Sequence, residues 1–236
     1  MYIINYKGLD KGLCSCLSIS KNEKEGYYSA FEGDGFSKCN SLIPDKDFEG
    51  KIESEEQVRE YIRNYYINVL SKLDPEKIYR ELEGKTLVTF DDGEFSHGYI
   101  VAAWFELFLD TEVKCVEKIE FYKKLKDVKP KWVVDVLEEE IKKTIDNMRG
   151  FNSVRALYLF NRSEEQEKIA NELENKLLND KSLSGEEFYK LNDRVCGYRQ
   201  EACFTRCDAD MAEDAWRERR YKLVEEAKTR SKKREA

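Results

Sequence analysis

Hydrophobic positions follow two different periods in the first half of the chain. Residues 13–20 alternate, with leucine and isoleucine mainly on one side and cysteine and serine on the other, which is the period of a β-strand. Short apolar runs at 2–6, 85–90 and 111–121 predict three more strands. From residue 54 onward, apolar positions recur every three or four residues, as they do on one face of a helix.

Capping residues mark the starts of the helices that separate these strands. Ser54 is followed three residues later by Gln57, which forms a capping box. Asp74 precedes a proline, the residue best suited to the first position of a helix. Ser96 caps the strongly apolar helix that follows it. Strands that alternate with helices predict a sheet with parallel neighbours and helices packed on it.

Residues 22–50 form the longest stretch without a clear period. The stretch contains glycines, a proline and several aromatic residues. A loop of this length in a compact domain is usually functional or mobile. Two interpretations stay open, a lid over a site and an ordinary packed loop.

The second half of the chain predicts helices only. Residues 132–149 and 164–179 carry amphipathic patterns, residues 154–160 favour helix over strand, and a capping box at Ser184 begins one or two long helices reaching Arg234. The fold class is therefore α/β, a small and largely parallel sheet with packed helices, followed by an all-α module. We place the domains at 1–126 and 127–236.

Charge and composition exclude some functions. The net charge of −7 disfavours nucleic-acid binding by the molecule as a whole. Residues 217–234 hold nine basic and three acidic residues, which suits a solvated helix end better than a nucleic-acid site. The sequence shows no signal peptide and no apolar run long enough to cross a bilayer, so we expect a cytoplasmic protein that has no contact with membranes.

The seven cysteines predict no metal site. Cys196, Cys203 and Cys207 are spaced by seven and four, which places them loosely on one face of a helix. A zinc site needs four ligands, and the usual paired CxxC motif is absent. We expect these cysteines to be reduced packing residues, and we predict no cofactor.

The loop before the apolar helix concentrates the polar chemistry of the first half. Asp91, Asp92, Glu94 and His97, the single histidine, lie within seven residues at a strand-to-helix junction. Ligands of α/β proteins bind at such junctions, and a neutral histidine beside carboxylates can act as a general base. Alternatively, the acidic residues only stabilise the helix dipole and the histidine is simply exposed.

Three segments carry a resemblance to a known family. LSISK (17–21), YIRNYYINVLSKLDPEKIYREL (61–82) and LVTFDDGEFSHGYIVAAWFE (87–106) resemble the bacterial family catalogued as domain of unknown function 488. The resemblance covers residues 1–121 and implies nothing about 130–236. It implies a polar site around the strand–loop–helix segment, and hence an enzyme or ligand-binding domain.

The chain departs from the family motif at most of the implied site. Where the family has cysteine, glutamate and a second cysteine, this sequence has Thr89, Asp91 and Ser96. His97 keeps the first histidine of the motif. Gly98 and Tyr99 stand where the family has an arginine and a second histidine, so two cationic side chains are lost. Lys21 replaces an earlier arginine of the family and keeps its positive charge.

Two functions follow from these patterns. The first is a degenerate family-like domain with a helical arm that binds a protein partner or self-associates, for instance as a regulator in a host or phage system. The alternative is a small-ligand or hydrolase-type site with His97 as base and Asp91 as its orienting acid. The residues expected to contact such a ligand are Lys21, Thr89, Glu94, Ser96 and Tyr99.

Overall fold

The computed structural model describes residues 2–5, 16–18, 37–38, 40–44, 54–89, 95–116, 129–145 and 147–235. The chain divides into two compact units, residues 1–146 and 147–236. The division falls after Asp146 and not near residue 127, because the helix at 132–144 packs with the first unit.

The first unit contains an α/β fold, as the sequence predicts. Its described strands form a five-stranded sheet with the order β3-β2-β4-β1-β5, and every pair of neighbours is parallel. Ile3 on the inner strand β1 pairs with Leu87 on one side and with Cys115 on the other, and all three are buried. The strands are β1 (Tyr2–Asn5), β2 (Cys16–Ser18), β3 (Ser37–Lys38), β4 (Thr86–Thr89) and β5 (Lys114–Val116).

The predicted caps begin the helices of the first unit. Ser54 accepts a hydrogen bond from the backbone N–H of Gln57, and Asp74 accepts one from that of Lys77. The short elements β3 and η2 fall inside residues 22–50, so that stretch is not wholly irregular. The α-helices are α1 (Glu55–Asn68), α2 (Pro75–Glu81), α3 (His97–Leu109) and α4 (Trp132–Thr144). Two short 3-10 helices are η2 (Asn40–Leu42) and η3 (Leu70–Lys72).

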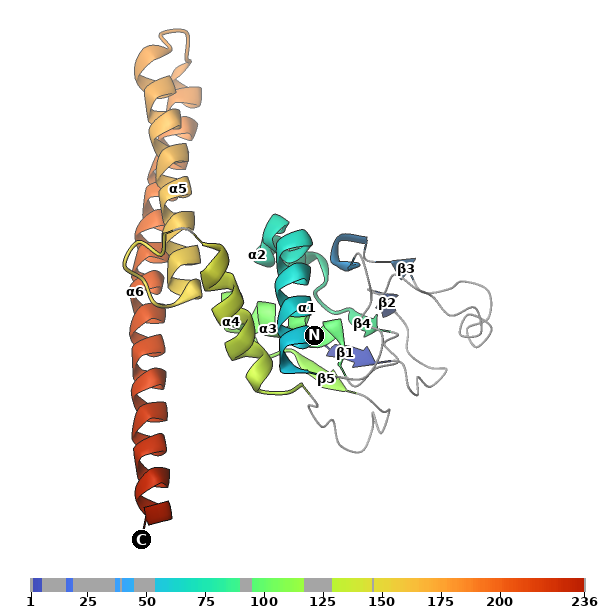
Figure 1. Cartoon of the computed structure of the whole chain (residues 1–236). Coiled ribbons are helices and arrows are strands. Elements are labelled where there is room, and N and C mark those ends of the chain that lie inside the picture. The colour runs from blue at the N-terminus through green and yellow to red at the C-terminus, as the bar shows by residue number, and fades with distance from the viewer. Residues whose placement is uncertain are drawn as a thin grey trace. The chain divides into compact units, whose positions relative to one another are not determined.

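Helix α3 is the centre of the first unit's core (Figure 1). It is apolar around its whole circumference, and nearly all of its residues are buried. It contacts β1, β4 and β5 along the sheet, and α2 and α4 also pack on it. An ion pair between Lys129 and Glu106 joins the start of the α4 segment to α3.

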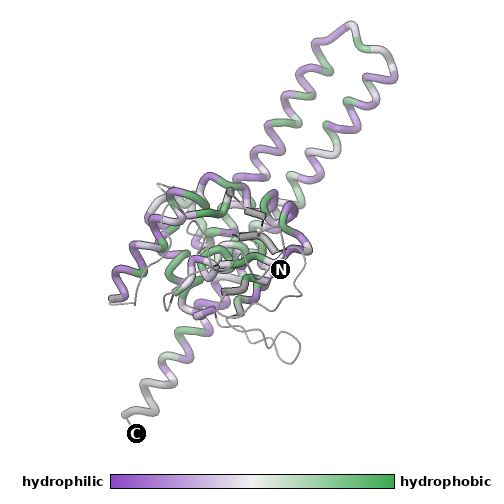
Figure 2. The backbone as a smooth tube through the Cα atoms, turned by 90° about the vertical axis from the view of Figure 1, so that its right-hand side faces the viewer, coloured by the Kyte–Doolittle hydropathy of each residue, from purple (hydrophilic) through white to green (hydrophobic). Residues whose placement is uncertain are grey.

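The second unit is an antiparallel hairpin of two long helices, α5 (Val154–Asn179) and α6 (Gly185–Glu235). α5 includes the segment 154–160, and α6 runs unbroken through Gly197. Figure 2 shows that both helices are mainly hydrophilic, with hydrophobic residues recurring at intervals along each of them. The hydrophobic seam of α6 contains Leu191, Val195, Ala202 and Ala209, which are buried at spacings of four and seven.

α6 is much longer than α5 and continues past the point where α5 begins (Figure 1). The capping box predicted at Ser184 is present: its hydroxyl caps the N–H of Glu187, whose carboxylate accepts the N–H of Ser184. Across the described helices, none has an apolar stretch long enough to span a bilayer.

Candidate functional site

The junction between β4 and α3 is held by side-chain hydroxyl groups. The hydroxyl of Ser96 accepts a hydrogen bond of 3.1 Å from the backbone N–H of Gly98, and so caps α3. The same oxygen lies 3.0 Å from the hydroxyl of Thr89, the last residue of β4. Both side chains are buried. These two predicted site residues therefore fasten the strand end to the helix start.

His97 lies inside this junction and not in solvent. His97 is fully buried, and its ring packs edge to face on the ring of Tyr65, with 5.8 Å between the two centroids. The Tyr65 hydroxyl donates a hydrogen bond of 2.7 Å to the carbonyl of Leu42. Tyr99 is also buried and packs edge to face on Phe95. The exposed histidine left open by the sequence pattern is thus excluded.

The structure brings together four of the seven residues predicted for this site. Thr89, Ser96, His97 and Tyr99 gather at the carboxyl end of β4 and the first turn of α3. The other three predicted site residues, which supply its charges, lie outside the described part of the chain: Lys21, Asp91 and Glu94.

At Gly98 the backbone of α3 lies close against the sheet. A Cβ atom at this position would lie 2.7 Å from the Cγ2 atom of Ile3 and 3.0 Å from that of Thr89. The Gly98 carbonyl is 3.8 Å from the thiol of Cys115, which donates to it from β5. The first turn of α3 is therefore packed against three strands, with no space for a side chain at residue 98.

A pocket of about 490 Å³ lies between α1 and α4, and none of the four described site residues predicted from sequence lines it. Trp132, at the first position of α4, forms one wall; it is 41% exposed, and its ring stacks on Phe95 at 5.9 Å. The lining combines this ring with valines and charged side chains: Glu55, Val58, Arg59, Trp132, Asp135, Val136 and Glu139. The pocket could not be predicted from the sequence because its two walls are far apart in the chain. An exposed tryptophan at a helix start was the available signal.

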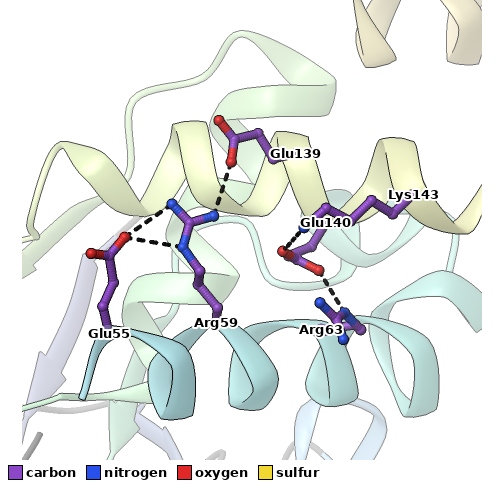
Figure 3. Close-up of polar contacts among 6 residues, drawn as sticks. All are labelled: Glu55, Arg59, Arg63, Glu139, Glu140 and Lys143. Atoms are coloured by element: carbon purple, nitrogen blue, oxygen red, sulfur yellow. Dashed lines mark hydrogen bonds and ion pairs between the residues drawn. The ribbon is translucent and has the colours of Figure 1, made fainter. Parts of the chain in front are cut away.

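Ion pairs join α1 to α4 beside this pocket (Figure 3). The guanidinium of Arg59 lies 3.0 Å from Glu55 on its own helix and 2.9 Å from Glu139 on α4. One turn further along, Arg63 and Lys143 lie 2.6 Å and 2.7 Å from Glu140.

Glu140 is buried in spite of its charge. Burial by itself would raise the pKa of this carboxyl, but hydrogen bonds from Arg63 and Lys143 outweigh burial and leave the pKa below its usual value. The carboxylate is thus ionised at neutral pH and acts as a structural link between α1 and α4.

The hairpin exposes a second candidate surface on α6. Its side chains, Cys196, Cys203, Phe204, Cys207 and Met211, are named the α6 stripe below. All five are exposed, with Phe204 at 60% and Met211 at 62%. The prediction that the three cysteines pack inside is wrong. Two of them, Cys196 and Cys203, directly follow seam residues, and a step of one residue turns a side chain about 100° around a helix.

No group of three or more histidine, cysteine or acidic residues is arranged to hold a metal ion within the described ranges. Comparison of the chain with family models, with curated proteins and with solved structures gave no match. The likeness of residues 1–121 to domain of unknown function 488 stays an expectation from sequence.

Proposed function

We propose that this protein is a protein-interaction or regulatory protein whose helical hairpin binds a partner through the α6 stripe. The observation that carries this proposal is the exposure of Cys203, Phe204, Cys207 and Met211 along one face of α6. Contiguous apolar side chains on a soluble helix are a common signature of a binding surface. Amphipathic helices bind partners through such i, i+3, i+4 and i+7 positions.

The junction at the start of α3 supports the same proposal, because its described residues favour a structural role over a catalytic one. His97, Thr89 and Ser96 are buried, and the hydroxyl groups bond to one another and to the helix backbone. The resemblance implies an arginine at the position of Gly98, where even a Cβ would crowd Ile3. These contacts favour a structural role for the described part of the junction.

The test is capture of the partner with matched variants. A tagged chain from its native host is compared with a Phe204→Ser/Met211→Ser variant, which removes the two largest apolar side chains of the stripe. We expect the captured protein to be lost from this variant and kept by Trp132→Ala, a control that changes an exposed aromatic residue in the other unit. Equal capture by the stripe variant and the wild type would contradict the proposal.

A second candidate is binding of a small ligand in the pocket between α1 and α4. Its volume of about 490 Å³ is within the usual range for ligand pockets, and Trp132 offers an accessible ring beside several carboxylates. Screening small cationic compounds by the fluorescence of Trp132 in a variant lacking the other two tryptophans tests this candidate. A ligand whose binding disappears in Trp132→Ala supports it, and a screen without such a ligand counts against it.

A further inference from the structure

We propose that the partner of α6 is a second copy of this chain, bound through an antiparallel contact between the two α6 helices. The inference rests on the proposed function, because it names the occupant of the α6 stripe. Its basis is the distribution of charge along α6 together with the length of that helix.

The net charge along α6 changes from negative to positive near Ala215. Residues 201–214 hold five acidic residues and one basic residue, whereas residues 217–234 hold nine basic and three acidic. The two segments lie on either side of Ala215, which is small and exposed. An antiparallel pair of α6 helices aligned about Ala215 therefore sets each acidic segment against the basic segment of the other copy. A parallel pair in register would set like charges together, which destabilises it.

The acidic segment has charges available for such a contact. Asp208 and Asp210 are exposed, and they form no ion pair with any other residue that the structure describes. Alignment about Ala215 brings Asp208 level with Lys222 of the second copy along the helix axis, and Asp210 level with Arg220, so that the two pairs flank the contact. Those two basic side chains are also exposed, and their contacts lie within their own helix, with Glu218 and Trp216.

Apolar side chains of the two copies lie within about one helical turn of one another in the same alignment. Phe204 and Met211 of one copy lie along the segment of the other that carries Tyr221 and Val224. Tyr221 is 69% exposed and Val224 is 51% exposed. Segments 201–214 and 217–230 together extend over about 45 Å of helix, which is enough for several turns of contact on each copy. Charge and apolar surface thus point to the same partner.

The length of α6 gives an independent reason for a partner. Glu213 contacts Asn152 and Ser153 at the start of α5, and α6 continues for more than twenty residues past this point. Residues 217–229 are exposed on every side. Most of the stability of a helix in a protein comes from packing of one of its faces, and this exposed segment has no such packing within its own chain. The second copy supplies the packing that this segment lacks.

The experiment is a charge exchange read by molecular mass. One variant carries Asp208→Lys and Asp210→Lys, and the other carries Arg220→Glu and Lys222→Glu. Each variant alone sets like charges across the contact, but a mixture of the two restores opposite charges in a heterodimer. Mass is measured by light scattering after gel filtration and by sedimentation equilibrium, at low and at high salt.

We expect the wild type to dimerise, with a dissociation constant that rises about tenfold or more in high salt. Each charge variant is expected to be monomeric, and the equimolar mixture is expected to form a dimer containing one of each. The restored mixture also shows that both variants are folded. Glu165→Lys/Glu172→Lys on α5 is the matched control, because it makes the same charge change at exposed residues outside the contact and should leave the dimer intact.

Three results would overturn the second copy as the partner: a wild type that is monomeric at every concentration, charge variants that dimerise as well as the wild type, or a mixture that stays monomeric. A monomeric wild type that still captures another protein through Phe204 and Met211 would leave the proposed function standing. Loss of both the dimer and the capture would remove both proposals.

Discussion

The carboxylate of Glu213, far along α6, accepts a hydrogen bond of 2.9 Å from the backbone N–H of Ser153, the residue that caps α5. The same carboxylate accepts the backbone N–H and the side-chain amide of Asn152, at 2.8 Å and 2.7 Å. A negative charge is favourable there because it faces the positive end of the α5 dipole. One side chain therefore holds the open end of the hairpin together.

Replacing Glu213 with alanine should destabilise the hairpin by about 1–3 kcal/mol, because the buried backbone N–H of Ser153 and the part-buried N–H of Asn152 lose a charged acceptor. Urea unfolding followed by circular dichroism measures the change. Asp214→Ala is the matched control: its side chain is 78% exposed, whereas that of Glu213 is 6% exposed, and its loss should cost less than about 0.5 kcal/mol. Equal effects of the two substitutions would contradict the role assigned to Glu213.

Acid should weaken both units through two buried carboxylates. Burial would raise the pKa of Glu213, but hydrogen bonds from Asn152 and Ser153 and the charge of Arg217 leave it below the ordinary value of 4.5, and the pKa of Glu140 is lowered similarly. A carboxyl with a lowered pKa binds its proton more weakly in the folded state. Its stabilisation is complete above about pH 4.5 and is lost as the pH falls through the folded-state pKa.

The measurement is the free energy of unfolding between pH 7 and pH 3 for the wild type, Glu213→Gln and Glu140→Gln. Each substitution removes one titrating group, so each variant should show a shallower fall in stability with acid. A slope identical to that of the wild type in both variants would show that these carboxyls do not carry the acid sensitivity.

Two glycines in helices should respond to alanine in opposite ways. Gly98→Ala places a Cβ 2.7 Å from Ile3 and should cost about 1–3 kcal/mol, as overpacking of a core does. Gly197→Ala adds a methyl group with no heavy atom within 4 Å and should stabilise α6 by about 0.5–1 kcal/mol. Thermal unfolding of both variants measures the difference. If Gly98→Ala were as stable as the wild type, α3 would have to lie further from the sheet than the structure places it.

Local contacts explain which parts of the fold could be predicted from sequence. The caps at Ser54, Asp74, Ser96 and Ser184 depend on residues two or three positions away, so the sequence pattern alone locates them. The parallel sheet followed from the alternation of strands and helices.

The features that escaped prediction depend on residues distant in the chain. Trp132 forms a pocket with α1, and Glu213 caps a helix that begins some sixty residues earlier. His97 is buried partly because Tyr65, on a different helix, packs against its ring. The residues next to His97 in the sequence do not indicate this contact. The exposure of Cys203 depends on which residues of α6 face α5, and that is decided by the seam as a whole.

The cysteines of α6 should be far more reactive than Cys115 in β5. Cys196, Cys203 and Cys207 are exposed, whereas Cys115 is 2% exposed and bonded to the carbonyl of Gly98. Alkylation of the folded Arg220→Glu/Lys222→Glu variant, in which the proposed contact between two α6 helices is broken, uses N-ethylmaleimide and is read by peptide mass spectrometry. It should modify the three α6 cysteines at least about a hundredfold faster than Cys115, because a buried thiol reacts only after local opening. In denaturant all four rates should converge. Rapid labelling of Cys115 in the native protein would mean that the contact between α3 and β5 opens readily, and the closed packing inferred around Gly98 would be wrong.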